Sequence, residues 1–230
     1  MNVLIFGASG MLGQGVLREC LLAADVAQVR TVGRTALTQR DGKLSELVQA
    51  DLLDLSGVEA QLTGFDACFF TLGTSAAGLS EAQYSRVTYD LTLAVAEVLA
   101  RLNPQMTFVY VSGAATDSTE KGRVMWARVK GRTENALQRL PFKAVYLFRP
   151  GVIAPLDGIV SKTPVYRVFY TLTKPLLAVT RALFPNAMAT TRSIGQAMLE
   201  AARHGAPQAI CEVKDIAALA ARAAKAASGT

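Results

Sequence analysis

The sequence reads Asn2-Val3-Leu4-Ile5-Phe6 and then Gly7-Ala8-Ser9-Gly10-Met11-Leu12-Gly13, an apolar run followed by a loop with three glycines. The run has the length of a buried strand, and apolar residues recur at helical spacing over 12–24. The glycines therefore lie where a strand turns into a helix, which lets a phosphate approach the backbone. Amide groups of the first helical turn, aided by the helix dipole, are expected to bind a pyrophosphate. The residues concerned are Gly7, Ser9, Gly10, Met11, Leu12 and Gly13.

The spacing of these glycines is GxxGxxG rather than GxGxxG, so an ordinary glycine-rich turn is the alternative interpretation. Their place between a predicted strand and a predicted helix favours a nucleotide site over that alternative.

Strand-like and helix-like segments alternate along the chain. We predict strands at 2–6, 28–33, 46–50, 66–72, 107–112 and 144–149, and helices at 12–24, 56–63, 80–101 and 124–139. Such alternation is typical of a doubly wound α/β fold, in which a parallel sheet carries helices on both faces. We expect residues 1–230 to form a single domain of this kind.

After Arg149, glycines and prolines break the sequence into shorter pieces. We expect a small, mainly helical C-terminal part there, with helices at 193–203 and from Asp215 onward, and residues 151–214 on the substrate side of a cleft. Two short helices are predicted within 165–184, where Arg167, Lys174 and Arg181 recur every seven residues. This spacing fits either an interfacial amphipathic segment or a solvated stripe on a packed helix.

Composition excludes several classes of protein. The 230 residues are 51% hydrophobic and 18% charged, as in a folded globule. Three cysteines without CxxC spacing and a single histidine argue against a metal site, and the net charge of +6 comes without a nucleic-acid-binding motif. No membrane span or leader is recognised, so the expected location is cytoplasmic.

Two positions after the second and third predicted strands would contact an adenosine. Arg34 stands where an acid binds the ribose 2′-hydroxyl and a cation binds a 2′-phosphate, which favours NADP(H) over NAD(H). Asp51 could accept from the adenine amino group while Leu52 touches the ring. A surface arginine and a helix N-cap are the alternatives for Arg34 and Asp51.

The next strands also end in residues suited to a ligand. Leu72-Gly73-Thr74 follows the fourth strand, where a glycine lets the backbone pass close to a cofactor and a plain turn is the alternative. Ser112 ends the fifth strand, and Lys130 follows eighteen residues later.

These motifs, in this order, resemble the short-chain dehydrogenase/reductase superfamily, and most closely its small atypical, epimerase-like NAD(P)-binding members with a Rossmann fold. The likeness covers about residues 1–155 and includes Val129-Lys130-Gly131, Glu134 and Arg149-Pro150-Gly151-Val152. It implies that Pro150, Gly151 and Val152 lie beside the nicotinamide. It also implies a small-molecule substrate and, as in many relatives, a homodimer formed by helices such as 80–101 and 124–139.

The resemblance further implies a Ser-Tyr-Lys set in which Ser112 orients the substrate and Lys130 holds the nicotinamide ribose. The position of the tyrosine, four residues before the lysine, is occupied by Trp126, whose indole cannot exchange a proton at neutral pH. Substitute acid/base groups would be Tyr84, Tyr89, Tyr110, Asp117 or Glu120.

Two functions follow from these residues. One is a reductase or epimerase-like enzyme that acts on a small carbonyl or alcohol substrate with another group in place of the tyrosine. The other is a catalytically silent NADP(H)-binding regulatory or scaffold protein, which Trp126 favours.

Overall fold

The structure is a computed structural model that describes residues 1–159 and 189–228. Its main sheet contains β1 (Asn2–Phe6), β2 (Gln28–Gly33), β3 (Leu44–Val48), β4 (Ala67–Phe70), β5 (Thr107–Val111), β6 (Ala144–Phe148) and β9 (Ile210–Cys211). The seven strands are parallel and lie in the order β3-β2-β1-β4-β5-β6-β9. Two short strands, β7 (Ile153–Ala154) and β8 (Ala189–Thr190), pair separately. The order reverses between β1 and β4, which is where open α/β sheets bind ligands.

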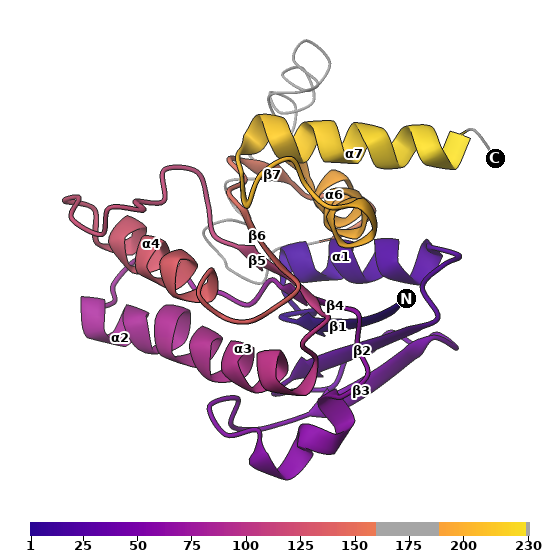
Figure 1. The fold of residues 1–230 in the computed structure, drawn as a ribbon, viewed down its shortest axis with the longest axis horizontal. Helices are drawn as coiled ribbons and strands as arrows, with labels where there is room; N and C mark the ends of the chain where they lie inside the picture. Colours follow the sequence, from indigo (N-terminus) through magenta and orange to yellow (C-terminus); the bar gives the residue numbers. More distant parts are fainter. Residues whose placement is uncertain (160–188, 229–230) are drawn as a thin grey trace.

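Helices cover both faces of this sheet (Figure 1). One face carries α1 (Met11–Leu22), α6 (Thr191–His204) and α7 (Val213–Ser228). The other carries α2 (Glu81–Ser85), α3 (Leu91–Leu102) and α4 (Met125–Leu137), with a 3₁₀ helix, η1 (Ser56–Leu62), and a π-helical segment, η2 (Arg86–Asp90). The predicted doubly wound α/β fold is therefore confirmed.

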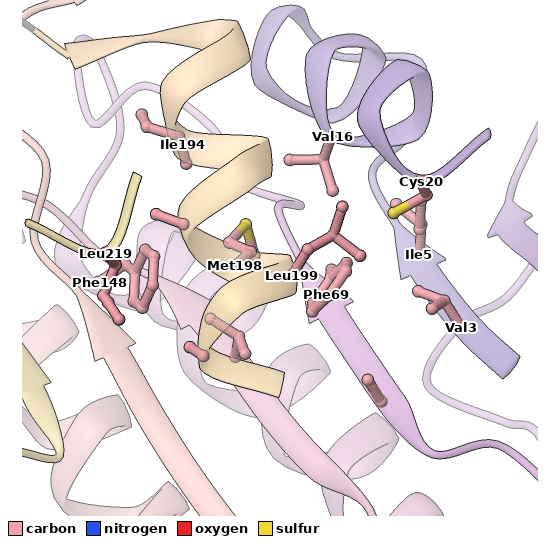
Figure 2. Packing of buried hydrophobic residues seen from close by; sticks show 14 of the residues in the cluster. Val3, Ile5, Val16, Cys20, Phe69, Phe148, Ile194, Met198, Leu199 and Leu219 are labelled. Atoms are coloured by element: carbon pink, nitrogen blue, oxygen red, sulfur yellow. The ribbon is translucent and has the colours of Figure 1, made fainter. Parts of the chain in front are cut away.

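The core is divided by the sheet into two apolar clusters. In β1, Val3 and Ile5 enter the cluster beneath α1, α6 and α7, whereas Leu4 and Phe6 enter the opposite one. Successive side chains of a strand point to opposite faces, so a continuous apolar run predicts this double burial. Figure 2 shows Met198 and Leu199 of α6 among the side chains of the first cluster.

Several predicted bounds are wrong by a few residues. The third strand begins at Leu44 rather than at 46 because Leu44 already pairs with Val29 of β2. The predicted helix at 80–101 has the expected capping box between Ser80 and Gln83, but the π-helical segment interrupts it. Strand β9 was not predicted because two residues carry no periodicity. The prediction for 165–184 lies outside the described residues.

Candidate functional site

The loop between β1 and α1 is shaped by two close backbone approaches. Gly7 has φ of +86°, and a Cβ there would lie 2.6 Å from the backbone nitrogen of Leu72. A Cβ on Gly13 would lie 2.1 Å from the carbonyl oxygen of Gly7, so only glycine lets α1 pack against the loop. Gly10, the N-cap of α1, offers no side-chain cap, which leaves first-turn amides for a ligand or water.

A cavity of about 880 Å³ opens above the carboxyl ends of β1, β2, β3 and β4. It brings together nine of the predicted cofactor-binding residues: Gly7, Ser9, Gly10, Arg34, Asp51, Leu52, Leu72, Gly73 and Thr74. The other predicted site residues do not line it: Met11, Leu12, Gly13, Ser112, Lys130, Pro150, Gly151 and Val152. The cavity therefore matches the pyrophosphate and adenosine half of the expected site.

Two arginines line this cavity. Arg34 is exposed after β2, as expected, whereas Arg86 comes from the π-helical segment and was not predicted. π-Helical turns are frequent at functional sites, but nothing in the sequence marks one here. The lining carboxylate of Glu46 accepts from Arg40 at 2.8 Å and from the backbone nitrogen of Leu37 at 2.5 Å. Its charge is thus compensated, and the arginines remain available for an anionic ligand.

Asp51 has a local role in the structure. Its Oδ1 accepts from the backbone nitrogen of Leu53 at 2.9 Å, which stabilises the turn after β3 rather than capping a helix. The side chain of Leu52 is buried beside the cavity.

The serine at the end of β5 points into a buried polar network. Ser112 Oγ donates to Glu134 Oε1 at 2.5 Å and to the carbonyl oxygen of Phe148 at 3.2 Å. Glu134 is fully buried and accepts from Arg149 Nε at 3.1 and 3.2 Å and from the Arg149 Nη2 group. Arg149 also donates to Glu212 at 3.2 Å. The carboxylate and guanidinium satisfy each other, which a buried ion pair requires.

Lys130, on α4, lies beside Ser112, which follows β5. Its Nζ donates to the main-chain oxygen of Ser112. Burial lowers the pKa of the Lys130 ammonium from 10.5 to about 8, and the charge of Glu134 opposes that shift. The structure therefore brings Ser112 and Lys130 together, as predicted, and adds Glu134 and Arg149 behind them.

The tyrosines considered as substitutes are held elsewhere. Tyr84 and Tyr110 are almost fully buried, and burial raises the pKa of Tyr110 far above its usual value. Tyr89 packs under the Arg132 guanidinium, whose carbon lies 4.0 Å from the ring centroid. Trp126 is half-buried on α4, one turn before Lys130.

Two carboxylates of the loop after β5 are also engaged. Asp117 accepts from the Thr119 hydroxyl at 2.6 Å and from the Gly122 backbone at 2.6 Å, and these bonds lower the pKa of Asp117. Glu120 accepts from Asn135 at 2.7 Å. Both side chains thus stabilise the loop.

Comparisons with known proteins support the family and the fold. The model of the NAD dependent epimerase/dehydratase family matches residues 3–123. The chain is 30% identical over 160 residues to protein fmp52, mitochondrial, of Emericella nidulans, covering 66% of this chain and 67% of that protein. It is 30% identical over 154 residues to protein HTATIP2 of Rattus norvegicus, which covers 66% of this chain and 62% of that protein.

Solved structures share the fold at low identity. WbmG of Bordetella bronchiseptica, solved in complex with NAD, superposes with a TM-score of 0.66 and 13% identity over 92% of this chain and 72% of that one. The short-chain dehydrogenase/reductase YIR035C of Saccharomyces cerevisiae superposes with a TM-score of 0.62 and 14% identity, over 96% of this chain and 98% of that one.

The expected cytoplasmic location is wrong by these comparisons, because the fungal relatives carry the word mitochondrial in their names. That expectation came from the lack of a recognised membrane span or leader. Cys20, Cys68 and Cys211 are indeed free and buried, but buried thiols do not distinguish one reducing compartment from another. Within 1–159 and 189–228, each helix is too short or too polar to cross a bilayer.

Proposed function

Because this chain belongs to the NAD dependent epimerase/dehydratase family, whose members bind NAD(P) in a Rossmann fold, we propose that it is an NADP(H)-dependent oxidoreductase. Its substrate would be a small carbonyl or alcohol compound, to which the bound nicotinamide supplies or from which it takes a hydride. The observation that carries the proposal is the cavity at the switch point of the sheet, with Arg34 and Arg86 in its lining.

The two arginines support a preference for NADP(H) over NAD(H). A 2′-phosphate adds negative charge and three acceptor oxygens, which guanidinium groups bind by charge-assisted hydrogen bonds. Each such bond contributes about 1.5–3 kcal/mol, or roughly 10- to 150-fold in Kd. Of the two acidic residues in the lining, Glu46 is paired with Arg40, and Asp51 accepts from the backbone of its own turn.

Cofactor preference is tested by titrating the purified chain with NADPH and NADH and following the emission of Trp126, its single tryptophan. We expect Arg34→Leu and Arg86→Leu each to weaken NADPH binding about tenfold or more, with NADH changed less than about threefold. Arg139→Leu, which changes an exposed arginine in the turn after α4, is the matched control. Tighter binding of NADH than of NADPH by the unaltered chain would refute the preference.

A silent NADP(H)-binding regulatory or scaffold protein is the second candidate, and Trp126 favours it. Screening small aldehydes and ketones for NADPH oxidation, with the unaltered chain and with Trp126→Tyr, separates the two. If the unaltered chain turns over and Trp126→Tyr does not increase the rate, the hypothesis of a silent protein is excluded. If only Trp126→Tyr turns over, that hypothesis is supported.

We further propose a single domain over residues 1–230, with residues 151–214 on the substrate side and a homodimer through α3 and α4. Within that range α6 packs on α1. Light scattering of the purified chain tests the dimer.

A further inference from the structure

We propose that Lys130 itself is the acid/base of this chain: its Nζ donates the proton to the substrate oxygen in reduction and accepts it in oxidation. The inference rests on the proposed oxidoreductase function and deepens it. It assigns to the lysine the proton transfer for which the resemblance would require a tyrosine.

The neighbouring groups leave this role to the lysine. The indole at position 126 does not exchange a proton at neutral pH, and the Ser112 hydroxyl is directed to the buried carboxylate of Glu134 at 2.5 Å. Tyr84 and Tyr110 are almost fully buried in the core. Each of these side chains is therefore unsuited to proton transfer at a substrate.

Lys130 contacts Ser112 after β5, the strand next to the last one whose end lines the cavity. The cavity follows β3, β2, β1 and β4 and ends at Leu72, Gly73 and Thr74. The next strand is β5, and Phe70 at the end of β4 pairs with Tyr110 of β5. Leu72 and Ser112 each follow two residues after this pair, at the same edge of the sheet. A dinucleotide whose adenosine lies near Arg34 would thus reach β5 with its nicotinamide half.

The lysine head group is held by one hydrogen bond. Its Nζ donates to the main-chain oxygen of Ser112, its only hydrogen-bond partner among the described residues. An ammonium has three donors, so two remain for a ribose hydroxyl and a substrate oxygen. The adjacent loop residue is Gly113, where even a Cβ would lie 3.9 Å from Nζ. Gly113 therefore places no side chain against Nζ.

The charges around the lysine allow both protonation states near neutrality. Glu134, on the same helix, favours the ammonium, but Arg149 from the end of β6 compensates that carboxylate. Asp117, in the loop after β5, turns its side chain to Thr119 and Gly122. With its pKa lowered to about 8 by burial, Lys130 is mostly protonated at pH 7 and loses its proton readily.

The proton balance is simple. When bound, the reduced nicotinamide supplies a hydride to the carbonyl carbon. The π electron pair of the carbonyl moves to oxygen, which takes one proton from the Lys130 ammonium and leaves an alcohol and a neutral amine. The amine regains a proton from water, and oxidation of the alcohol follows the same steps in reverse.

The first test does not depend on turnover. Trace acetylation with acetic anhydride between pH 6 and 11, read by peptide mass spectrometry on the full chain, gives the apparent pKa of each lysine. We expect Lys130 to titrate near 8, and we expect NADPH to protect Lys130 but not the exposed Lys225 from acetylation. A Lys130 that titrates near 10.5 overturns the proposal.

The second test uses NADPH oxidation with hexanal, cyclohexanone and 2,3-butanedione. Lys130→Ala should lower kcat about 100-fold or more, and added ethylamine should restore part of it with a pH profile set by the free amine. Lys225→Ala, on the exposed side of α7, is the matched control and should keep full activity.

The outcomes separate this inference from the proposed function. If the chain does not bind NADPH, both the inference and the proposed function fail. If the chain binds and oxidises NADPH but Lys130→Ala keeps kcat within about threefold, the inference fails and the proposed function stands. A loss in Lys130→Ala that appears only in the KM for NADPH, without amine rescue, also overturns it, because the lysine would then serve cofactor binding alone.

Discussion

Removing one partner of the buried ion pair between Glu134 and Arg149 should destabilise the protein far more than removing one partner of a surface pair of similar geometry. Glu134 is fully buried, and the side chain of Arg149 is 9% exposed. Removing one partner of such a pair leaves an uncompensated charge and costs about 3–5 kcal/mol. In Glu134→Ala, Arg149 keeps the half-exposed Glu212 at 3.2 Å, so we expect the lower value, about 3 kcal/mol.

The chain contains a matched surface pair. Arg101 and Glu59 lie 2.5 Å apart, with side chains 59% and 30% exposed. Exposed pairs contribute about 0–1 kcal/mol, so Glu59→Ala should change the free energy of unfolding by less than about 1 kcal/mol.

Thermal and urea unfolding measure both variants. For a domain of this size 1 kcal/mol shifts Tm by about 2–4 °C, so Glu134→Ala should lower Tm by roughly 6–12 °C and Glu59→Ala by at most about 4 °C. The double variant Glu134→Met/Arg149→Met removes both charges and should regain most of the loss. If Glu134→Ala and Glu59→Ala shift Tm equally, the assignment of a desolvated, mutually dependent pair is wrong.

Three further changes test other parts of the structure. Gly13→Ala should cost about 1–3 kcal/mol and weaken NADPH binding because its Cβ would meet the Gly7 carbonyl at 2.1 Å; Gly57→Ala, with open space around it, should be neutral in both. Between pH 8 and 10.5 the unfolded chain binds more protons at Lys130 than the folded one, so urea midpoints of the unaltered chain should rise with pH relative to Lys130→Met. Thr190→Ala removes the capping box of α6 and should lower the free energy of unfolding by about 1 kcal/mol, also measured in urea.

The fold could be predicted because its signals are local. An apolar run such as Leu4–Phe6 indicates a strand buried on both faces, and Gly7 and Gly13 occur where only glycine fits the turn. The grouping of the residues predicted to contact an adenosine followed from the same logic, because residues directly after parallel strands meet at one edge of the sheet. Arg34 and Asp51 line the cavity for that reason.

The rest of the site depends on contacts that sequence spacing does not encode. Arg86 reaches the cavity from a π-helical segment that the helical pattern does not reveal. Glu134 and Arg149 are 15 residues apart on different elements, and Glu212 is 63 residues beyond Arg149. The motif that contains Lys130 suggested its place beside Ser112, but the lysine's environment became visible only when these distant partners came together.

This network explains why a costly buried charge lies behind the proposed proton donor. Glu134 is one turn after Lys130 on α4, and Arg149 joins it to the end of β6, to Ser118 and to Glu212 before α7. Apolar residues of similar volume could stabilise the fold as well, but they would not fix the rotation of α4 against β5. A shift of that helix would move Nζ from the Ser112 carbonyl. We therefore infer that the pair positions α4 more than it stabilises the fold. Glu134→Met/Arg149→Met should then stay folded, while the pKa of Lys130 measured by acetylation changes.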